Sequence, residues 1–145
     1  MLTGLIHLHS ALRWVILILL LVSIVQAFSK NGSLQKTSLF LLIAAHITLL
    51  LGIFQYFAGD FGFKIIDRVG GFGNVMKDGF ARFWVVEHLS AMLIAIVLIT
   101  MARGKAKKQN YSAASWMYVV ALILILAAVP WPFREGIARP WFPGM

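Results

Sequence analysis

Three histidines lie inside stretches of sequence that are otherwise apolar: His9, His46 and His88. Each stretch has about 20 residues, enough to cross the hydrocarbon core of a bilayer, where no water hydrates an imidazole. An ionisable side chain at that depth is costly, so it faces the interior of a helix bundle and marks a functional site. Ligation of a metal cofactor best accounts for several such imidazoles, and haem is the cofactor that we expect.

The depths of these histidines along their spans favour one pair. At a rise of about 1.5 Å per residue, His9 lies ~11 Å and His88 ~7 Å from the middle of their spans, toward the same face. His46 lies ~4 Å to the other side of the middle. We therefore expect one haem between His9 and His88, near the outer face. His46 is the third ligand candidate, and its alternatives are a relay group below the haem or a hydrogen bond at a tight helix crossing.

Two charged side chains lie at a depth similar to that of the favoured histidines. Arg13 follows His9 by four residues and shares its helix face. Glu87 directly precedes His88 and is the one acidic residue inside a predicted span. An ion pair between Arg13 and Glu87 is the simplest interpretation, because lipid requires charges to be paired. Alternatively, the guanidinium of Arg13 holds a haem propionate, or Glu87 moves protons to or from a quinone.

The segment after the last span combines prolines, aromatic residues and two arginines. It reads Pro-Trp-Pro-Phe-Arg at 130–134 and Arg-Pro-Trp-Phe-Pro at 139–143. Prolines stiffen such a tail and tryptophans favour the membrane interface, so one interpretation is an interfacial anchor. The alternative is a lid over the outer mouth of the bundle, in which Arg134 or Arg139 meets an acidic group such as a haem propionate.

The elements that must position these residues are four membrane-spanning helices. We predict spans at 7–28, 37–57, 81–101 and 112–129, and the absence of period-two alternation favours helices over a barrel. The chain is therefore predicted to be an all-α integral membrane four-helix bundle, a single domain over residues 1–145. Segment 58–80, rich in Gly and Phe, is expected to lie at the lipid interface, with Phe61, Phe63, Ile65 and Ile66 dipping into it.

Composition supports this class and excludes others. The chain of 145 residues is 61% hydrophobic and 12% charged, and it has no cysteine. A soluble domain carries about 25% charged residues. The missing cysteine excludes disulfides, iron–sulfur clusters, thiolate zinc sites and covalently attached haem. The net charge of +8 is concentrated at span ends, where it reports membrane topology and not nucleic-acid binding.

The distribution of cations predicts the orientation. Each side of the predicted bundle carries six Lys and Arg residues, but on one side they are concentrated in two short loops without an acidic residue. Those six are Lys30, Lys36, Arg103, Lys105, Lys107 and Lys108. Short cation-rich loops face the cytoplasm. We therefore expect both chain termini on the periplasmic or external side.

Taken together, these residues resemble a family of small four-span bacterial membrane proteins usually labelled cytochrome b or cytochrome b-like. The resemblance covers nearly the whole chain and rests on Leu8-His9-Ser10 with Arg13-Trp14, on Ala45-His46 with Leu50-Leu51-Gly52 and Tyr56-Phe57, on Glu87-His88 with Met92, and on Pro130-Trp131-Pro132-Phe133 with Arg139-Pro140. It implies b-type haem held by histidines, with His9, His46 and His88 as candidates. In larger cytochromes b, paired histidines on one helix hold two stacked haems. This chain lacks such a pair, which argues against a path for electrons across the membrane through two haems.

We therefore expect a haem b protein of the bacterial inner (cytoplasmic) membrane that passes single electrons. Two axial imidazoles leave no position on the iron for oxygen. The expected partners are the lipid bilayer, quinone and a respiratory or periplasmic redox protein, and an oligomer is compatible with the sequence. Whether the protein is an enzyme by itself stays open. The alternatives are a non-redox accessory subunit of a larger membrane complex and a metal-free module that binds quinone or lipid.

Overall fold

The computed structural model describes residues 2–59 and 62–129 of the chain. Four long helices dominate it: α1 (Leu2–Phe28), α2 (Leu34–Ala58), α6 (His88–Lys107) and α7 (Tyr111–Ala128). Each belongs to a segment that is long and apolar enough to cross a membrane, and no strand occurs among the described residues. The prediction of an all-α, multi-pass membrane bundle is confirmed.

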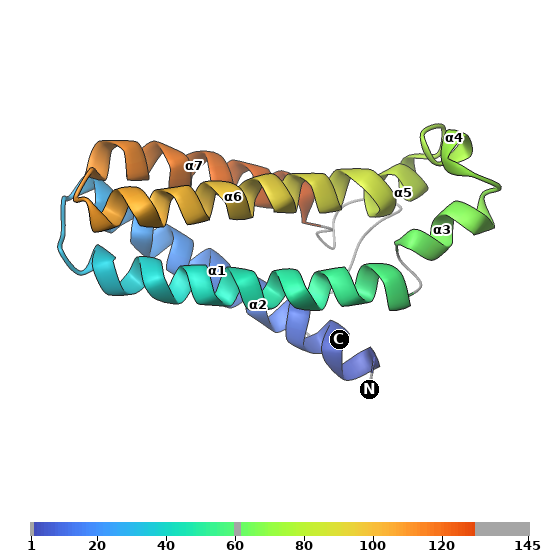
Figure 1. Cartoon of the computed structure of the whole chain (residues 1–145), viewed down its shortest axis with the longest axis horizontal. Helices are drawn as coiled ribbons and strands as arrows, with labels where there is room; N and C mark the ends of the chain where they lie inside the picture. Colours follow the sequence, from blue (N-terminus) through green and yellow to red (C-terminus); the bar gives the residue numbers. More distant parts are fainter. Residues whose placement is uncertain (1, 60–61, 130–145) are drawn as a thin grey trace.

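The helices form a closed ring of neighbours. Helix α6 packs along α7, α1 packs against both α2 and α7, and α2 completes the ring by contacting α6. Figure 1 shows α6 and α7 side by side, while α1 runs obliquely across the bundle. Large apolar side chains on the outside of every long helix are exposed, as a surface in contact with acyl chains requires; examples are Ile18, Leu50, Ile94 and Ile123.

The third span differs from the single helix that the sequence predicts. It begins with α5 (Gly79–Arg82), continues through a π-helical turn, η1 (Phe83–Glu87), and only then becomes α6. A π-turn adds one residue to a helical turn and is frequent at functional sites. The composition of Phe83–Glu87 does not predict the π-turn, since this segment contains neither proline nor glycine.

Between α2 and α5 the chain forms two short helices, α3 (Phe63–Arg68) and α4 (Phe72–Val75), which extend beyond the end of the bundle in Figure 1. Gly70 and Gly71, between them, have φ angles of +87° and +125°, which favour glycine. Phe63 is half exposed, which is compatible with the expected position at the lipid interface, whereas Ile65 is buried and does not dip outward. Ile65 packs inward in a second small apolar cluster, with Val75, Ala81 and Val85. Phe61 lies outside the described residues.

The end of the bundle that carries loop 29–33 and loop 108–110, called here the basic end, is tightly packed. Small residues of α6 and α7 face each other there, including Ala102, Ala106, Ala114 and Ala121, and all are fully buried. Small side chains let membrane helices approach closely. The Arg103 guanidinium donates hydrogen bonds to the Gln35 carbonyl (2.8 Å) and to Ser38 Oγ (2.9 Å), which ties α6 to α2.

Candidate functional site

A cavity lies between α1, α2 and α6 at the opposite end of the bundle, called here the histidine end. Its volume is about 190 Å³. His9 of α1 and His88 of α6 both line it.

His9 is held against α2 by a close approach. A Cβ atom added at Gly52 would lie 3.3 Å from His9 Cε1, so the missing side chain of Gly52 makes room for the imidazole. His9 Nδ1 is buried and has no hydrogen-bond partner among the described residues. A buried polar atom without a partner is costly, so a bound ligand would relieve this cost.

His88 is oriented from the opposite side by α7. Its Nδ1 donates a hydrogen bond of 2.8 Å to the carbonyl of Ala128, the last residue of α7. Carbonyls in the last turn of a helix have no partner inside that helix, so this one is available. Because the proton is on Nδ1, the lone pair is on Nε2. Metal-ligating histidines use this same arrangement, in which a backbone carbonyl fixes tautomer and ring orientation.

The π-turn contributes to the placement of His88. Aromatic rings of Phe83 and Trp84, both in η1, contact the imidazole at centroid distances of 5.7 Å each. The Tyr56 hydroxyl of α2 donates a hydrogen bond of 2.9 Å to the Val85 carbonyl of the same turn. Irregular helical turns need such partners for their backbone carbonyls, because lipid supplies none. Tyr56 therefore anchors the turn from which α6 and His88 begin.

The structure does not bring His46 to the other two histidines. Its side chain is exposed on the outer face of α2 and is absent from the cavity wall. His46 Nδ1 donates a hydrogen bond of 2.8 Å to the Leu42 carbonyl, four residues earlier in the same helix. The prediction that His46 forms a hydrogen bond between two helices is therefore wrong.

The ion pair between Arg13 and Glu87 does not form. Arg13 lines the cavity, and its guanidinium lies 5.2 Å from the ring centroid of Trp14. Glu87 is exposed and pairs instead with Arg82, at 3.2 Å between Nε and Oε1. The five-residue separation matches a π-turn, in which residues i and i+5 are neighbours. The prediction failed because it assumed a regular helix through Glu87.

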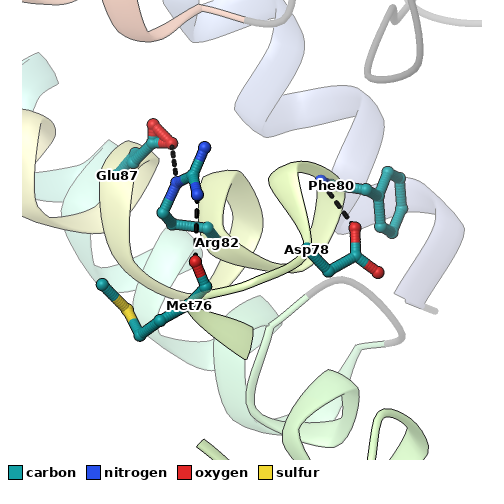
Figure 2. Close-up of polar contacts among 5 residues, drawn as sticks. All are labelled: Met76, Asp78, Phe80, Arg82 and Glu87. Carbon is teal, nitrogen blue, oxygen red and sulfur yellow. Dashed lines mark hydrogen bonds and ion pairs between the residues drawn. The ribbon is translucent and has the colours of Figure 1, made fainter. Parts of the chain in front are cut away.

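Arg82 is a residue that the sequence analysis missed. Figure 2 shows its guanidinium between the Glu87 carboxylate and the Met76 carbonyl, to which it donates a hydrogen bond of 3.0 Å. Nearby, Asp78 accepts a hydrogen bond from the backbone of Phe80 and caps α5. Arg82 thus connects the π-turn to the segment before it. Arg134 and Arg139, the proposed lid arginines, lie outside the described residues.

The donor set fits a haem better than a bare metal ion. A bare transition-metal ion takes three or four protein ligands. In the described part of the chain, no group of three or more His, Cys, Asp or Glu side chains is placed to hold one. A haem iron requires only axial ligands from the protein, because the porphyrin occupies the remaining positions. Two imidazoles, His9 and His88, on different walls of one cavity meet that requirement.

Comparisons with protein-family models, with curated proteins and with solved structures find no match to this chain.

Proposed function

We propose that this protein is a membrane-bound b-type haem protein that passes single electrons, in which His9 and His88 would hold the iron. One observation carries the proposal: imidazoles from α1 and α6 line the same cavity within the apolar part of the bundle. The buried Nδ1 atom of His9 and the carbonyl-bound Nδ1 atom of His88 support it. The resemblance to cytochrome b-like proteins points in the same direction.

The roles of the surrounding residues follow from their positions. Haem, when bound, supplies a one-electron redox couple whose potential depends on burial and nearby charge. Ala128 and Tyr56 hold the His88 ring and its turn, while Gly52 admits the His9 ring. Arg13, at the cavity wall, is suited to bind a propionate through its planar guanidinium.

The proposed setting is the inner membrane of a bacterium, with both termini on the periplasmic side. The basic end then faces the cytoplasm, in accordance with the concentration of its six cations in two short loops without an acidic residue. The histidine end lies toward the periplasm, where a periplasmic redox protein can approach it. A quinone dissolved in the bilayer is the second electron partner that we propose. Glu87 is exposed and paired with Arg82, so we assign it no contact with the cofactor.

A visible spectrum of the purified protein tests the proposal. We expect a Soret band and sharp α and β bands after reduction, typical of iron with two axial imidazoles. His9→Ala and His88→Ala are each expected to abolish these bands or convert the iron to a high-spin form. His46→Ala is the matched control, because His46 is exposed on the outer face of α2; its spectrum should equal that of the unchanged protein.

Two results would contradict the proposal. A folded protein that stays colourless after hemin is supplied during expression would favour a non-redox accessory subunit. A loss of the bands in His46→Ala, with full retention in His88→Ala, would place the cofactor elsewhere in the bundle.

A further inference from the structure

The basic end of the bundle holds a cation between two helices. Arg103 of α6 is half-buried and donates hydrogen bonds to the Gln35 carbonyl and to Ser38 Oγ, both of α2. The Gln35 side chain in turn donates a hydrogen bond to the Ala106 carbonyl of α6. These contacts fix the guanidinium where the start of α2 meets the end of α6, a place called here the α2–α6 junction.

Part of the Arg103 guanidinium faces an acceptor from outside the bundle. Both hydrogen bonds that Arg103 makes among the described residues come from Nη1. Neither Nε nor Nη2 is among the buried nitrogen and oxygen atoms that lack a partner, so these two donors reach the surface. Adjacent N–H groups of a guanidinium match two oxygens of one phosphate or carboxylate group.

The described residues of the basic end offer no carboxylate to Arg103. The acidic residues of the chain are Asp60, Asp67, Asp78, Glu87 and Glu135. The three of these that the structure describes lie in or next to α3, α5 and η1, at the histidine end. Within the described part of the chain, the counter-charge for Arg103 therefore has to come from another molecule.

Two lysines lie beside Arg103 at the α2–α6 junction. Lys36 directly follows Gln35, whose carbonyl accepts from Arg103, and Lys107 lies one turn beyond Arg103 on the same face of α6. Both lysine side chains are exposed. Membrane topology requires cations at this end, but it does not explain why one of them is fixed between two helices with two more beside it. Arg103, Lys36 and Lys107 are called here the junction cluster.

The depth of the junction cluster matches that of lipid headgroups. Lys36 and Arg103 lie just outside the predicted spans 37–57 and 81–101, where the hydrocarbon core ends. Phe40 lies one turn deeper than Lys36 on the same face of α2 and is 58% exposed. A phosphate that carries acyl chains contacts both the cations and this ring, whereas a free phosphate ion contacts the cations alone.

We propose that the junction cluster binds the phosphate group of an anionic phospholipid in the leaflet at the basic end. Arg103 donates from Nε and Nη2 to the phosphate oxygens, and Lys36 and Lys107 contribute charge at the rim. A zwitterionic headgroup brings its own cation, which three cations without a carboxylate disfavour. We therefore expect a preference for phosphatidylglycerol over phosphatidylcholine.

Lipid binding to the purified protein in a neutral detergent tests the proposal. Each lipid is titrated separately, and the bound molecules per protein are counted by native mass spectrometry. We expect Lys36→Gln and Lys107→Gln each to weaken phosphatidylglycerol binding about fivefold, the equivalent of about 1 kcal/mol per cation. Arg103→Lys keeps the charge but removes the planar pair of donors, and a loss of similar size is expected.

Two control variants remove an exposed cation elsewhere. Lys30→Gln does so in the loop between α1 and α2, on the side of α2 that faces away from α6. Lys77→Gln does so at the histidine end. Both are expected to bind phosphatidylglycerol as the unchanged protein does. Because Lys36 and Lys107 are exposed, their variants separate a loss of lipid contacts from a packing defect at Arg103.

Several results would overturn the lipid site. Equal phosphatidylglycerol binding in every protein would remove the junction cluster from binding, and equal weakening in all variants would indicate attraction by net charge alone. Equal affinity for phosphatidylcholine would contradict the anionic preference. Displacement of the lipid by an equal concentration of glycerol 1-phosphate would indicate a site for a free phosphate ion. The visible spectrum is a separate readout, so a colourless protein with the expected lipid pattern would support the lipid site and overturn the haem proposal.

Discussion

The two ends of this bundle differ in how the space around their polar side chains is filled. At the basic end, Arg103, Gln35 and Ser38 form hydrogen bonds with one another and with the backbone, and small residues close the space between helices. At the histidine end, polar side chains surround a cavity, and a buried nitrogen of His9 has no partner among the described residues. Gln26 Oε1 and the Tyr118 hydroxyl, at the basic end, are likewise buried without a partner among the described residues. The ends therefore differ in space: small residues close the basic end, whereas the histidine end keeps a cavity that suits a ligand.

Backbone regularity follows the same division. The basic end consists of regular α-helix in α6 and α7, whereas the histidine end contains the π-turn η1 and the short helices α3, α4 and α5. A regular helix satisfies its own backbone inside lipid, but an irregular one depends on side chains such as that of Tyr56. The histidine end therefore gives up part of its internal stability to orient side chains toward the cavity. Three substitutions test this division.

Tyr118→Ala should have the largest effect on stability. Tyr118 is fully buried in the core cluster of the basic end, and loss of its ring leaves a cavity there. Removal of a buried aromatic side chain costs about 3–5 kcal/mol of unfolding free energy. The measurement is unfolding in detergent by titration with a denaturing detergent, with the visible spectrum of the folded fraction as control. A changed spectrum of the folded protein would contradict the division between the two ends.

Arg103→Met should have the next largest effect. It removes the donor for the Gln35 carbonyl and Ser38 Oγ, which costs about 1–3 kcal/mol because these acceptors lose a charged partner. Lys107→Met, at an exposed position of the same helix, is the matched control. Equal stabilities of the two variants would show that the hydrogen bonds of Arg103 do not hold the basic end together.

Tyr56→Phe should have the smallest effect on stability and a distinct effect on the site. Loss of the hydroxyl removes the hydrogen bond to the Val85 carbonyl, worth about 0.5–1.5 kcal/mol. Because the π-turn precedes His88, we also expect a shifted reduction potential of the bound haem. Tyr111→Phe, at the start of α7, serves as the control. A potential unchanged from that control would limit Tyr56 to a purely structural role.

Sequence reasoning recovered the spans and part of the site. The predicted spans at 7–28, 37–57 and 112–129 lie within or end one residue beyond the observed helices. The depth estimate placed His9 and His88 at nearly the same level, and both line one cavity. Depth is readable from sequence because a helix rises by a constant distance per residue.

The direction of each side chain around its helix could not be predicted. His46 and Glu87 were both expected inside the bundle, yet both are exposed. The spans are apolar on all sides, so no polar face in the sequence marks which side points outward. The π-turn adds a second source of error, because one extra residue in a turn rotates everything before it relative to α6.

What the amino-acid sequence determined by itself is therefore the membrane fold and the depth of each polar residue, since hydrophobic length and helical rise set both. Only the tertiary structure decided which polar residues meet: His9 with His88 across a cavity, Glu87 with Arg82, and Arg103 with Ser38. The physical reason is that the rotation of an apolar helix in a bundle depends on close packing of small and large side chains. That packing depends on pairs of helices, so it cannot be predicted from the sequence of a single helix.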